Sequence, residues 1–222
     1  MMNYLLFNRF IVSRTLRRWK GKPAMNKMTM NLETNSLGEL LFFIFLPVIR
    51  LISPLFFATK YLSGKYFEND ITGWKWVWRG IIWQKIFGIN RHIPWPVSPF
   101  IVITKAENIE FHVNDINNFQ TFGIYFQNFQ GKIVIGEGSY IGQNVGLITA
   151  NHDLMDPDTH QEGKDIILGK KCWIGMNSVI LPGVVLGDHT VVGAGSVVTK
   201  SFSEGYSIVA GNPAKIIRKL PE

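Results

Sequence analysis

The sequence of 222 residues predicts a mainly β protein whose central part is a parallel β-helix. The first observation is a six-residue period, because residues 168–203 divide into hexapeptides that begin with Leu168, Ile174, Ile180, Leu186, Val192 and Val198. The second is that four of these hexapeptides have glycine next, at 169, 175, 187 and 193. The third is an upstream block with the same phase, led by Ile135, Ile141 and Leu147. A period of six fits neither an α-helix nor a half-buried strand, and it is typical of a β-helix.

The period also predicts how the coil is built. Each hexapeptide forms one side of a three-sided coil, and successive turns stack at about 4.8 Å. The aliphatic first residues then point inward, and stability comes from stacking neighbouring turns. We expect the second-position glycines to turn the corners with positive φ, which a Cβ would disfavour. A sandwich or barrel rich in Val and Gly is the alternative, and the two phased blocks argue against it.

Charge and tryptophan content separate an N-terminal region from the coil. Residues 1–95 hold 14 Lys and Arg against 4 Asp and Glu, whereas residues 96–222 hold 9 against 12. Six of the seven tryptophans precede residue 96. The single cysteine excludes an internal disulfide. We therefore expect a basic, Trp-rich helical region over residues 1–95 and a slightly acidic β-helix after it.

The first 36 residues predict a helix and a linker. Residues 1–22 combine apolar side chains with five Arg and Lys residues between 9 and 20, which is typical of an amphipathic helix on an anionic membrane surface. A helix packed on the body of the protein fits equally well. A cleaved signal peptide does not fit, because the basic residues follow the apolar ones. Residues 21–36 are polar and unpatterned, which indicates a linker.

Two further segments suggest membrane contact. Residues 40–57 form an apolar run with a single charge, Arg50, and with Pro47 and Pro54, so a kinked interfacial helix fits better than a simple span. A buried helix or a trimer contact remains the alternative. Residues 73–83 interleave four tryptophans with Lys75 and Arg79, as membrane-interface belts do, although a strand face would show the same alternation. Nucleic-acid binding would leave the apolar run without a role, so the sequence predicts membrane contact through residues 1–85.

The coil is expected over residues 96–208. The proline-rich residues 92–99 lead into it, and early coils are predicted at Ile103, Ile109, Ile116, Phe122 and Phe129. The interval of 21 between Leu147 and Leu168 breaks the period of six, which predicts an extruded loop over residues 151–165. Residues 209–222 are expected to form a capping segment that ends in a short helix.

Several short motifs carry a family resemblance from about Ile101 to Leu220. They are Ala150-Asn151-His152-Asp153, Cys172-Trp173-Ile174-Gly175, Gly193-Ala194-Gly195-Ser196, Val198-Thr199-Lys200 and Gly211-Asn212-Pro213-Ala214-Lys215. These residues resemble the hexapeptide-repeat acyltransferases, in the branch of the maltose, galactoside and capsular-polysaccharide O-acetyltransferases. The resemblance implies a left-handed parallel β-helix and a homotrimer that binds acetyl-CoA between neighbouring subunits.

The resemblance also implies the site residues. His152 would be the general base that takes the proton of an acceptor hydroxyl, a role that suits the near-neutral pKa of histidine. Asp153 and Asp156 could orient it or simply solvate the loop. The acceptor side would include Asn128, His160 and Trp173. Acetyl-CoA would contact Met176, Ala194, Thr199, Lys200, Lys215 and Arg218, with the last two at the CoA phosphates.

Other reactive residues are given structural roles. Cys172 occupies the fifth position of its hexapeptide, so we expect a buried packing residue and not a nucleophile. His152, His160 and His189 lack the spacing of a recognised zinc set, so no metal is expected.

The sequence as a whole predicts an acetyl-CoA-dependent O-acetyltransferase for a sugar hydroxyl of a glycan, glycolipid or surface-polysaccharide precursor. We expect it in the bacterial cytoplasm, peripheral at the inner face of the membrane. One alternative is an N-acetyltransferase for an amino sugar or antibiotic. Another is a membrane-bound scaffold without catalysis, because this type of coil also occurs in non-enzymes.

Overall fold

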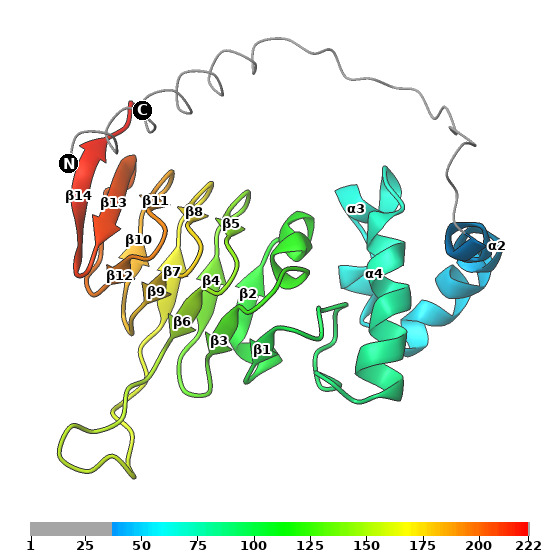
Figure 1. Cartoon of the computed structure of the whole chain (residues 1–222), viewed down its shortest axis with the longest axis horizontal. Coiled ribbons are helices and arrows are strands. Elements are labelled where there is room, and N and C mark those ends of the chain that lie inside the picture. Colours follow the sequence, from blue (N-terminus) through cyan, green and yellow to red (C-terminus); the bar gives the residue numbers. More distant parts are fainter. Residues whose placement is uncertain (1–36, 222) are drawn as a thin grey trace, which may run out of the picture. The chain divides into compact units, whose positions relative to one another are not determined.

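A computed structural model describes residues 37–221, so the helix and linker predicted for residues 1–36 lie outside the described residues. The chain divides into two compact units, Met1–Leu40 and Leu41–Glu222, and the contacts below belong to the second unit. In that unit a group of short helices is followed by a stack of coils that ends in a hairpin (Figure 1).

Short helices make up the chain before the coils. They are α2 (Leu37–Ile52), the 3₁₀ turns η1 (Ser53–Leu55) and η2 (Thr59–Tyr61), α3 (Lys65–Glu68), α4 (Thr72–Gly80) and the π-helix η3 (Ile81–Ile86). The alternating tryptophans at 74, 76 and 78 therefore lie on a helix, and the strand alternative for this stretch is wrong. Within residues 37–221, no helix combines the length and the apolar character that a bilayer crossing requires.

The coils form three sheets, which we call faces A, B and C and which are parallel except for the last strand of face C. Face A holds β1 (Val102–Ile103), β3 (Tyr125–Gln127), β6 (Gly146–Ile148), β9 (Val179–Ile180) and β12 (Val197–Val198). Face B holds β2 (Ile109–Phe111), β4 (Ile133–Ile135), β7 (Ile166–Leu168) and β10 (Val185–Leu186). Face C holds β5 (Tyr140–Ile141), β8 (Trp173–Ile174), β11 (Val191–Val192), β13 (Ser207–Gly211) and β14 (Ala214–Lys219). The 3₁₀ segments η4 (Ala106–Asn108) and η5 (Val113–Phe119) join the first coils.

The first residue of each hexapeptide lies inside the prism. Leu147 pairs with Ile180, and Ile180 pairs with Val198, so one residue from each turn stacks on the next along face A. All nine aliphatic residues that define the repeat are buried. Burial of an aliphatic side chain contributes about 1.5–3 kcal/mol, so the three columns that these residues form, one on each face, are the main source of stability for the coil.

The fifth position of the hexapeptide is also buried, and its polar atoms are satisfied. Ser178 Oγ donates to the Gly193 carbonyl at 3.0 Å, and Ser196 Oγ donates to the same oxygen at 2.6 Å. Cys172 is 1% exposed, and its Sγ donates to the Gly187 carbonyl at 3.3 Å. The prediction of a buried packing cysteine is therefore confirmed, and burial raises the pKa of its thiol.

The role expected for the second-position glycines is wrong. Positive φ occurs at the fourth position instead, in Gly138, Asn144, Lys171, Asn177, Gly183, His189 and Gly195. The second-position glycines are needed because the next turn passes very close to them. A Cβ on Gly175 would lie 2.5 Å from the backbone nitrogen of Ala194, and one on Gly142 would lie 2.7 Å from that of Met176.

The early coils are only partly as predicted. Ile103, Ile109 and Ile116 are buried, but Phe122 is 53% exposed and Phe129 is only partly buried. Phe126 and Ile133 occupy the interior instead. The register of the pattern differs here because the turn from Ile103 to its partner Phe126 spans 23 residues and includes η5.

The end of the chain differs from the expected short helix. β13 turns at Asn212-Pro213 and pairs with β14 in the antiparallel sense, with Ala210 opposite Lys215. The β-branched residues of this segment favour a strand, and Ile208 and Val209 continue face C beside β11. The last element is thus a hairpin that extends face C.

The helices are joined to the first coils by an aromatic core. Trp95 is fully buried, and its ring lies 5.0 Å from Tyr61, 5.1 Å from Phe111 and 5.2 Å from Phe119, measured between ring centroids. The helical region and the coils therefore share one hydrophobic core.

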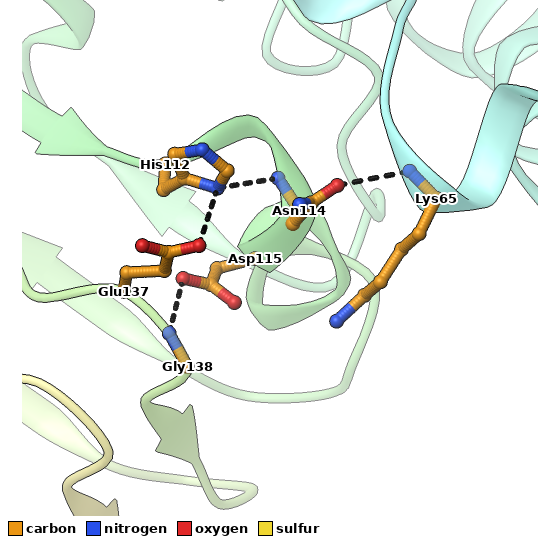
Figure 2. A network of polar contacts seen from close by, with 6 residues as sticks. All are labelled: Lys65, His112, Asn114, Asp115, Glu137 and Gly138. Atoms are coloured by element: carbon orange, nitrogen blue, oxygen red, sulfur yellow. Dashed lines mark hydrogen bonds and ion pairs between the residues drawn. The ribbon is translucent and has the colours of Figure 1, made fainter.

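A polar network supports the same junction (Figure 2). The Lys65 backbone N–H donates to Asn114 Oδ1 at 2.9 Å, and the Gly138 N–H donates to Asp115 Oδ2 at 2.8 Å. His112 Nδ1 lies 3.7 Å from Glu137 Oε1 and accepts from the Asn114 N–H. The network ties α3 to η5 and to the corner after β4.

Candidate active site

His152 lies in a loop that leaves the prism between faces A and B. Leu147 and Ile180 pair although they are 33 positions apart instead of the 18 of a regular turn, which leaves 15 extra residues for the loop. The Lys164 N–H donates to the Thr149 carbonyl at 2.8 Å and closes the base of the loop. The coil therefore keeps its register across the insertion (Figure 1).

The loop is held as a small antiparallel ladder. The Asp153 N–H donates to the Thr159 carbonyl at 3.0 Å, and the Gln161 N–H donates to the Asn151 carbonyl at 2.9 Å. His152 and His160 face each other across this ladder. Asp153 Oδ1 accepts from the Met155 N–H at 2.8 Å, so this carboxylate shapes the turn and does not contact His152.

The His152 ring has a defined tautomer. Its Nδ1 lies 2.6 Å from the Pro157 carbonyl oxygen, which can only accept, so Nδ1 carries the proton and donates. Nε2 of the neutral ring is then an acceptor, as a general base requires. The sequence did not reveal Pro157 as the orienting group, because it acts through a backbone carbonyl.

His160 supports the ring from one side. The centroids of the His152 and His160 rings lie 4.3 Å apart, and Phe129 meets His160 edge-on at 5.0 Å. Both histidines are exposed in the single chain. The structure therefore brings together His152 and His160, with Phe129 as an aromatic support that the sequence reasoning placed in the core.

Met176 and Ala194 lie along a different edge of the prism, where face C turns into face A. A ladder of backbone bonds defines this edge: Gly123 N–H to Phe100 O, Asn144 N–H to Phe122 O, Asn177 N–H to Gln143 O and Gly195 N–H to Met176 O, at 2.9–3.1 Å. The side chains of Met176 and Ala194 are exposed on it. Within one chain this C–A edge and the A–B edge with His152 are at opposite ends of the face A strands.

The remaining cofactor candidates lie near the C-terminal end of the coil. Thr199 and Lys200 follow β12 on the A–B edge, and Lys215 and Arg218 lie on β14; all four side chains are exposed. A cavity of about 270 Å³ lies between these two segments and is lined by Lys200, Phe202, Glu204, Ile216 and Lys219 among others. Lys219 Nζ pairs with Glu204 at 2.6 Å, which leaves Lys200 as the cation of this cavity without a carboxylate partner in the described residues.

The acceptor candidates Trp173 and Asn128 differ in their exposure to solvent. Trp173 is 60% exposed on β8, between Tyr140 and Val191 of the neighbouring strands, so its ring is available to a ligand. Asn128 is fully buried, and its amide accepts from the Lys105 N–H at 3.0 Å and donates to the Lys105 carbonyl at 2.6 Å. An acceptor cannot reach Asn128, and the role expected for it is contradicted by this burial.

No set of three or more His, Cys, Asp or Glu side chains within residues 37–221 is arranged to hold a metal ion.

Comparisons with known proteins give the coil its relatives. The family description "Bacterial transferase hexapeptide (six repeats)" matches residues 165–200. WcaF of Escherichia coli, which is named as a colanic acid biosynthesis acetyltransferase, is 40% identical over 92 residues, which cover 41% of this chain and 50% of WcaF. Galactoside O-acetyltransferase of Escherichia coli is 36% identical over 131 residues, which cover 56% of this chain and 60% of the relative. The chain thus spans about half the length of the curated relatives it matches.

A solved structure supports the architecture beyond the repeats. A galactoside acetyltransferase in complex with coenzyme A superposes with a TM-score of 0.50 at 24% identity, and the match covers 80% of this chain and 83% of that one. The predicted left-handed parallel β-helix with an N-terminal helical region is therefore confirmed. The coil of this chain thus contains hexapeptide repeats, and its fold is similar to that of the galactoside acetyltransferase.

Proposed function

We propose that the protein is an acetyl-CoA-dependent O-acetyltransferase whose acceptor is a sugar hydroxyl of a glycan, glycolipid or surface-polysaccharide precursor. The observation that carries the proposal is the bond between His152 Nδ1 and the Pro157 carbonyl, which leaves Nε2 as the acceptor. The sequence similarity to sugar O-acetyltransferases supports the choice of donor and acceptor.

The proposed reaction needs no covalent enzyme intermediate. His152 Nε2 takes the proton of the acceptor hydroxyl while that oxygen attacks the thioester carbon of acetyl-CoA. The tetrahedral intermediate collapses, the C–S bond breaks, and the proton on Nε2 passes to the CoA sulfur. The products are an acetyl ester and free CoA. Cys172 plays no part, because it is buried and its thiol pKa is raised by that burial.

A homotrimer would complete the site. Met176 and Ala194 lie on the C–A edge, and His152 lies on the A–B edge of the same chain. A threefold axis parallel to the prism would set the C–A edge of one subunit against the His152 loop of its neighbour, turn level with turn. Acetyl-CoA would then lie between subunits, with its phosphates toward Lys200, Lys215 and Arg218. Hydrogen bonds between these basic groups and the phosphates would be charge-assisted and therefore stronger than neutral ones.

We also propose peripheral contact with the cytoplasmic face of a bacterial membrane. Ile44, Val48, Leu51 and Leu55 follow helical spacing along α2 and η1, and they are 50–81% exposed. An apolar stripe of this kind favours a membrane interface. Co-sedimentation with anionic liposomes tests the contact, and Leu51→Glu with Leu55→Glu should abolish it. Liposome binding that survives this double substitution would refute the role of α2, and a change of oligomeric state would assign the stripe to a subunit contact.

The decisive experiment compares acetyl-CoA turnover by the wild type and by His152→Ala, with glycans and glycolipids of the native cell as acceptors. Loss of a general base should lower acceptor-dependent CoA release at least about a hundredfold. Leu154→Ala, at the 86% exposed tip of the same loop, is the matched control and should retain activity. A product cleaved by mild hydroxylamine is an ester, whereas a stable amide would indicate an N-acetyltransferase. Undiminished turnover in His152→Ala would remove His152 from the mechanism, and failure of both proteins to bind acetyl-CoA would favour the scaffold.

A further inference from the structure

A second cavity lies beside the C–A edge, between the N-terminal helices and the first coils. Its volume is about 330 Å³, and its lining includes Arg79, Trp83, Phe100, Phe122 and Gln143. Arg79 comes from α4 and Trp83 from η3, whereas the other three belong to the edge itself. The cavity thus joins the N-terminal helices to the edge that carries Met176 and Ala194.

The cavity has a positive charge without a carboxylate to balance it. Arg79 Nη2 donates to the neutral Gln120 Oε1 at 2.9 Å, and within residues 37–221 Arg79 forms no ion pair. Partial burial lowers the pKa of its guanidinium, because the charged form loses part of its hydration. No acidic side chain among the described residues compensates for this loss. Such a site is suited to an anion.

The walls of the cavity are aromatic and continue into an apolar surface. The Phe100 and Phe122 rings lie 5.3 Å apart, and the two side chains are 62% and 53% exposed. On the other side Trp83 lies 5.2 Å from Phe87, and Ile86 and Phe87 are both about two-thirds exposed. Exposed apolar side chains grouped in this way mark a binding surface for an apolar group.

The position of the cavity relates it to the proposed acetyl donor. Gln143 lines the cavity, and its carbonyl accepts from the Asn177 N–H, next to Met176. Because turns are spaced by about 4.8 Å, the cavity begins roughly 5–10 Å along the edge from the backbone assigned to acetyl-CoA. A sugar of ordinary size spans that interval.

We propose that this cavity binds the phosphate group of an acceptor whose sugar is carried on an apolar tail. The phosphate lies against the Arg79 guanidinium, whose planar fork matches phosphate oxygens. The sugar points along the C–A edge toward the acetyl group, and the tail covers Trp83, Ile86 and Phe87. The inference rests on the proposed function and narrows its acceptor to a sugar phospholipid.

A larger cavity, between the helical region and the A–B edge, provides a comparison. It has a volume of about 490 Å³ and contains Lys60, but Glu107 and Glu110 also line it. Glu110 is paired with Lys132 at 2.9 Å, which leaves Glu107 as the carboxylate that offsets Lys60 in this lining. The cavity therefore has no excess positive charge, and size alone does not select the site. Lys60→Gln is therefore the control for loss of one positive charge beside a cavity.

The test uses the full chain with saturating acetyl-CoA present, so that CoA phosphates do not compete for the site. Affinities are measured by calorimetry for geranyl phosphate, geraniol and glucose 1-phosphate. Geranyl phosphate should bind at least tenfold more tightly than either of the others. Arg79→Gln should weaken geranyl phosphate binding about tenfold to a hundredfold, as loss of a charged hydrogen bond does, and should leave geraniol unchanged. Lys60→Gln should change none of the three affinities.

A second variant, in another residue of the cavity, keeps the proposal testable if Arg79→Gln does not fold. Phe122→Ser removes an exposed ring and should weaken geranyl phosphate more than glucose 1-phosphate. Equal binding of geranyl phosphate by Arg79→Gln and the wild type would refute the proposal, and glucose 1-phosphate binding as tightly as geranyl phosphate would replace the lipid with a soluble sugar phosphate. Acetyl-CoA affinity is measured first, on the same proteins before saturating acetyl-CoA is added. Absence of acetyl-CoA binding by the wild type would refute the proposed function. Acetyl-CoA binding without Arg79-dependent binding of geranyl phosphate would refute only this inference.

Discussion

The coil and the helices before it use apolar residues in opposite ways. In the coil every aliphatic residue that leads a hexapeptide is buried, and the buried hydroxyl groups beside them are hydrogen-bonded. In the helical region Ile44, Leu51, Leu55, Ile86 and Phe87 are between 60% and 81% exposed. The coil is therefore stabilised by its own interior, whereas much of the apolar surface of the helices is available for binding. Hydrophobicity alone does not distinguish the two; the period of the pattern does.

The sharpest test of this comparison is a pair of leucine truncations. Leu168→Ala in the prism, where Leu168 is 1% exposed, should lower the free energy of unfolding by about 2–5 kcal/mol. Leu51→Ala on α2, where Leu51 is 79% exposed, should change it by no more than about 0.5 kcal/mol. Chemical denaturation measures both. A large loss from Leu51→Ala would mean that the α2 face is covered in the assembled protein.

Two glycine substitutions separate close packing from backbone conformation within the coil. Gly175→Ala should cost about 2–3 kcal/mol, because the new Cβ would overlap the Ala194 nitrogen of the next turn. Gly195→Ala should cost only about 1–2 kcal/mol, because Gly195 has a φ of +70° but a Cβ added there would have no neighbouring atom within 4 Å. Thermal denaturation of both variants gives the order. The reverse order would show that positive φ at the fourth position constrains the coil more than close packing at the second position does.

The junction between the two regions should show a smaller effect that depends on pH. Burial raises the pKa of Asp115, and the Gly138 N–H opposes that rise by donating to it. A raised pKa in the folded state means that stability decreases as the pH rises from about 3.9 through the folded value. Asp115→Asn keeps an acceptor for the Gly138 N–H and should remove this decrease. Asp115→Ala leaves the N–H unpaired and should cost about 1–2 kcal/mol at all pH values.

Denaturation of the three proteins between about pH 3 and pH 8, a range that spans the ordinary carboxyl pKa, checks this prediction. Parallel profiles for the wild type and Asp115→Asn would show that Asp115 does not titrate with folding.

The sequence predicted the fold well where the same packing contact recurs in every turn of the coil. The period of six predicted the buried lead residues from Ile135 to Val198, because each of them meets another aliphatic residue in the next turn of its face. It failed at Phe122 and Phe129, where η5 lengthens the turn and changes the register. It also failed at residues 209–220, where pairing with face C favoured a strand over the expected helix.

The candidate site was predictable only in part, because its groups act through the fold. His152 stands in a recognisable motif, but its partner is the carbonyl of Pro157, which residue type does not reveal. Asn128 carries a suitable side chain, yet it is fully buried and its amide is hydrogen-bonded to the backbone of Lys105. The Arg79 cavity combines residues that are up to 64 positions apart in the chain, from Arg79 to Gln143. No sequence motif predicts that these residues lie together.

The hairpin at the end of the coil bears on how the protein avoids growing into fibres. A stack of parallel turns would offer its last strand as a template on which another copy could continue. β14 covers β13 in the antiparallel sense and presents Lys215, Arg218 and Lys219 at the outer edge. A further parallel turn would meet a strand of reversed polarity with basic side chains on face C. The same segment that we assign to binding CoA phosphates therefore also acts as a stop to end-to-end polymerisation.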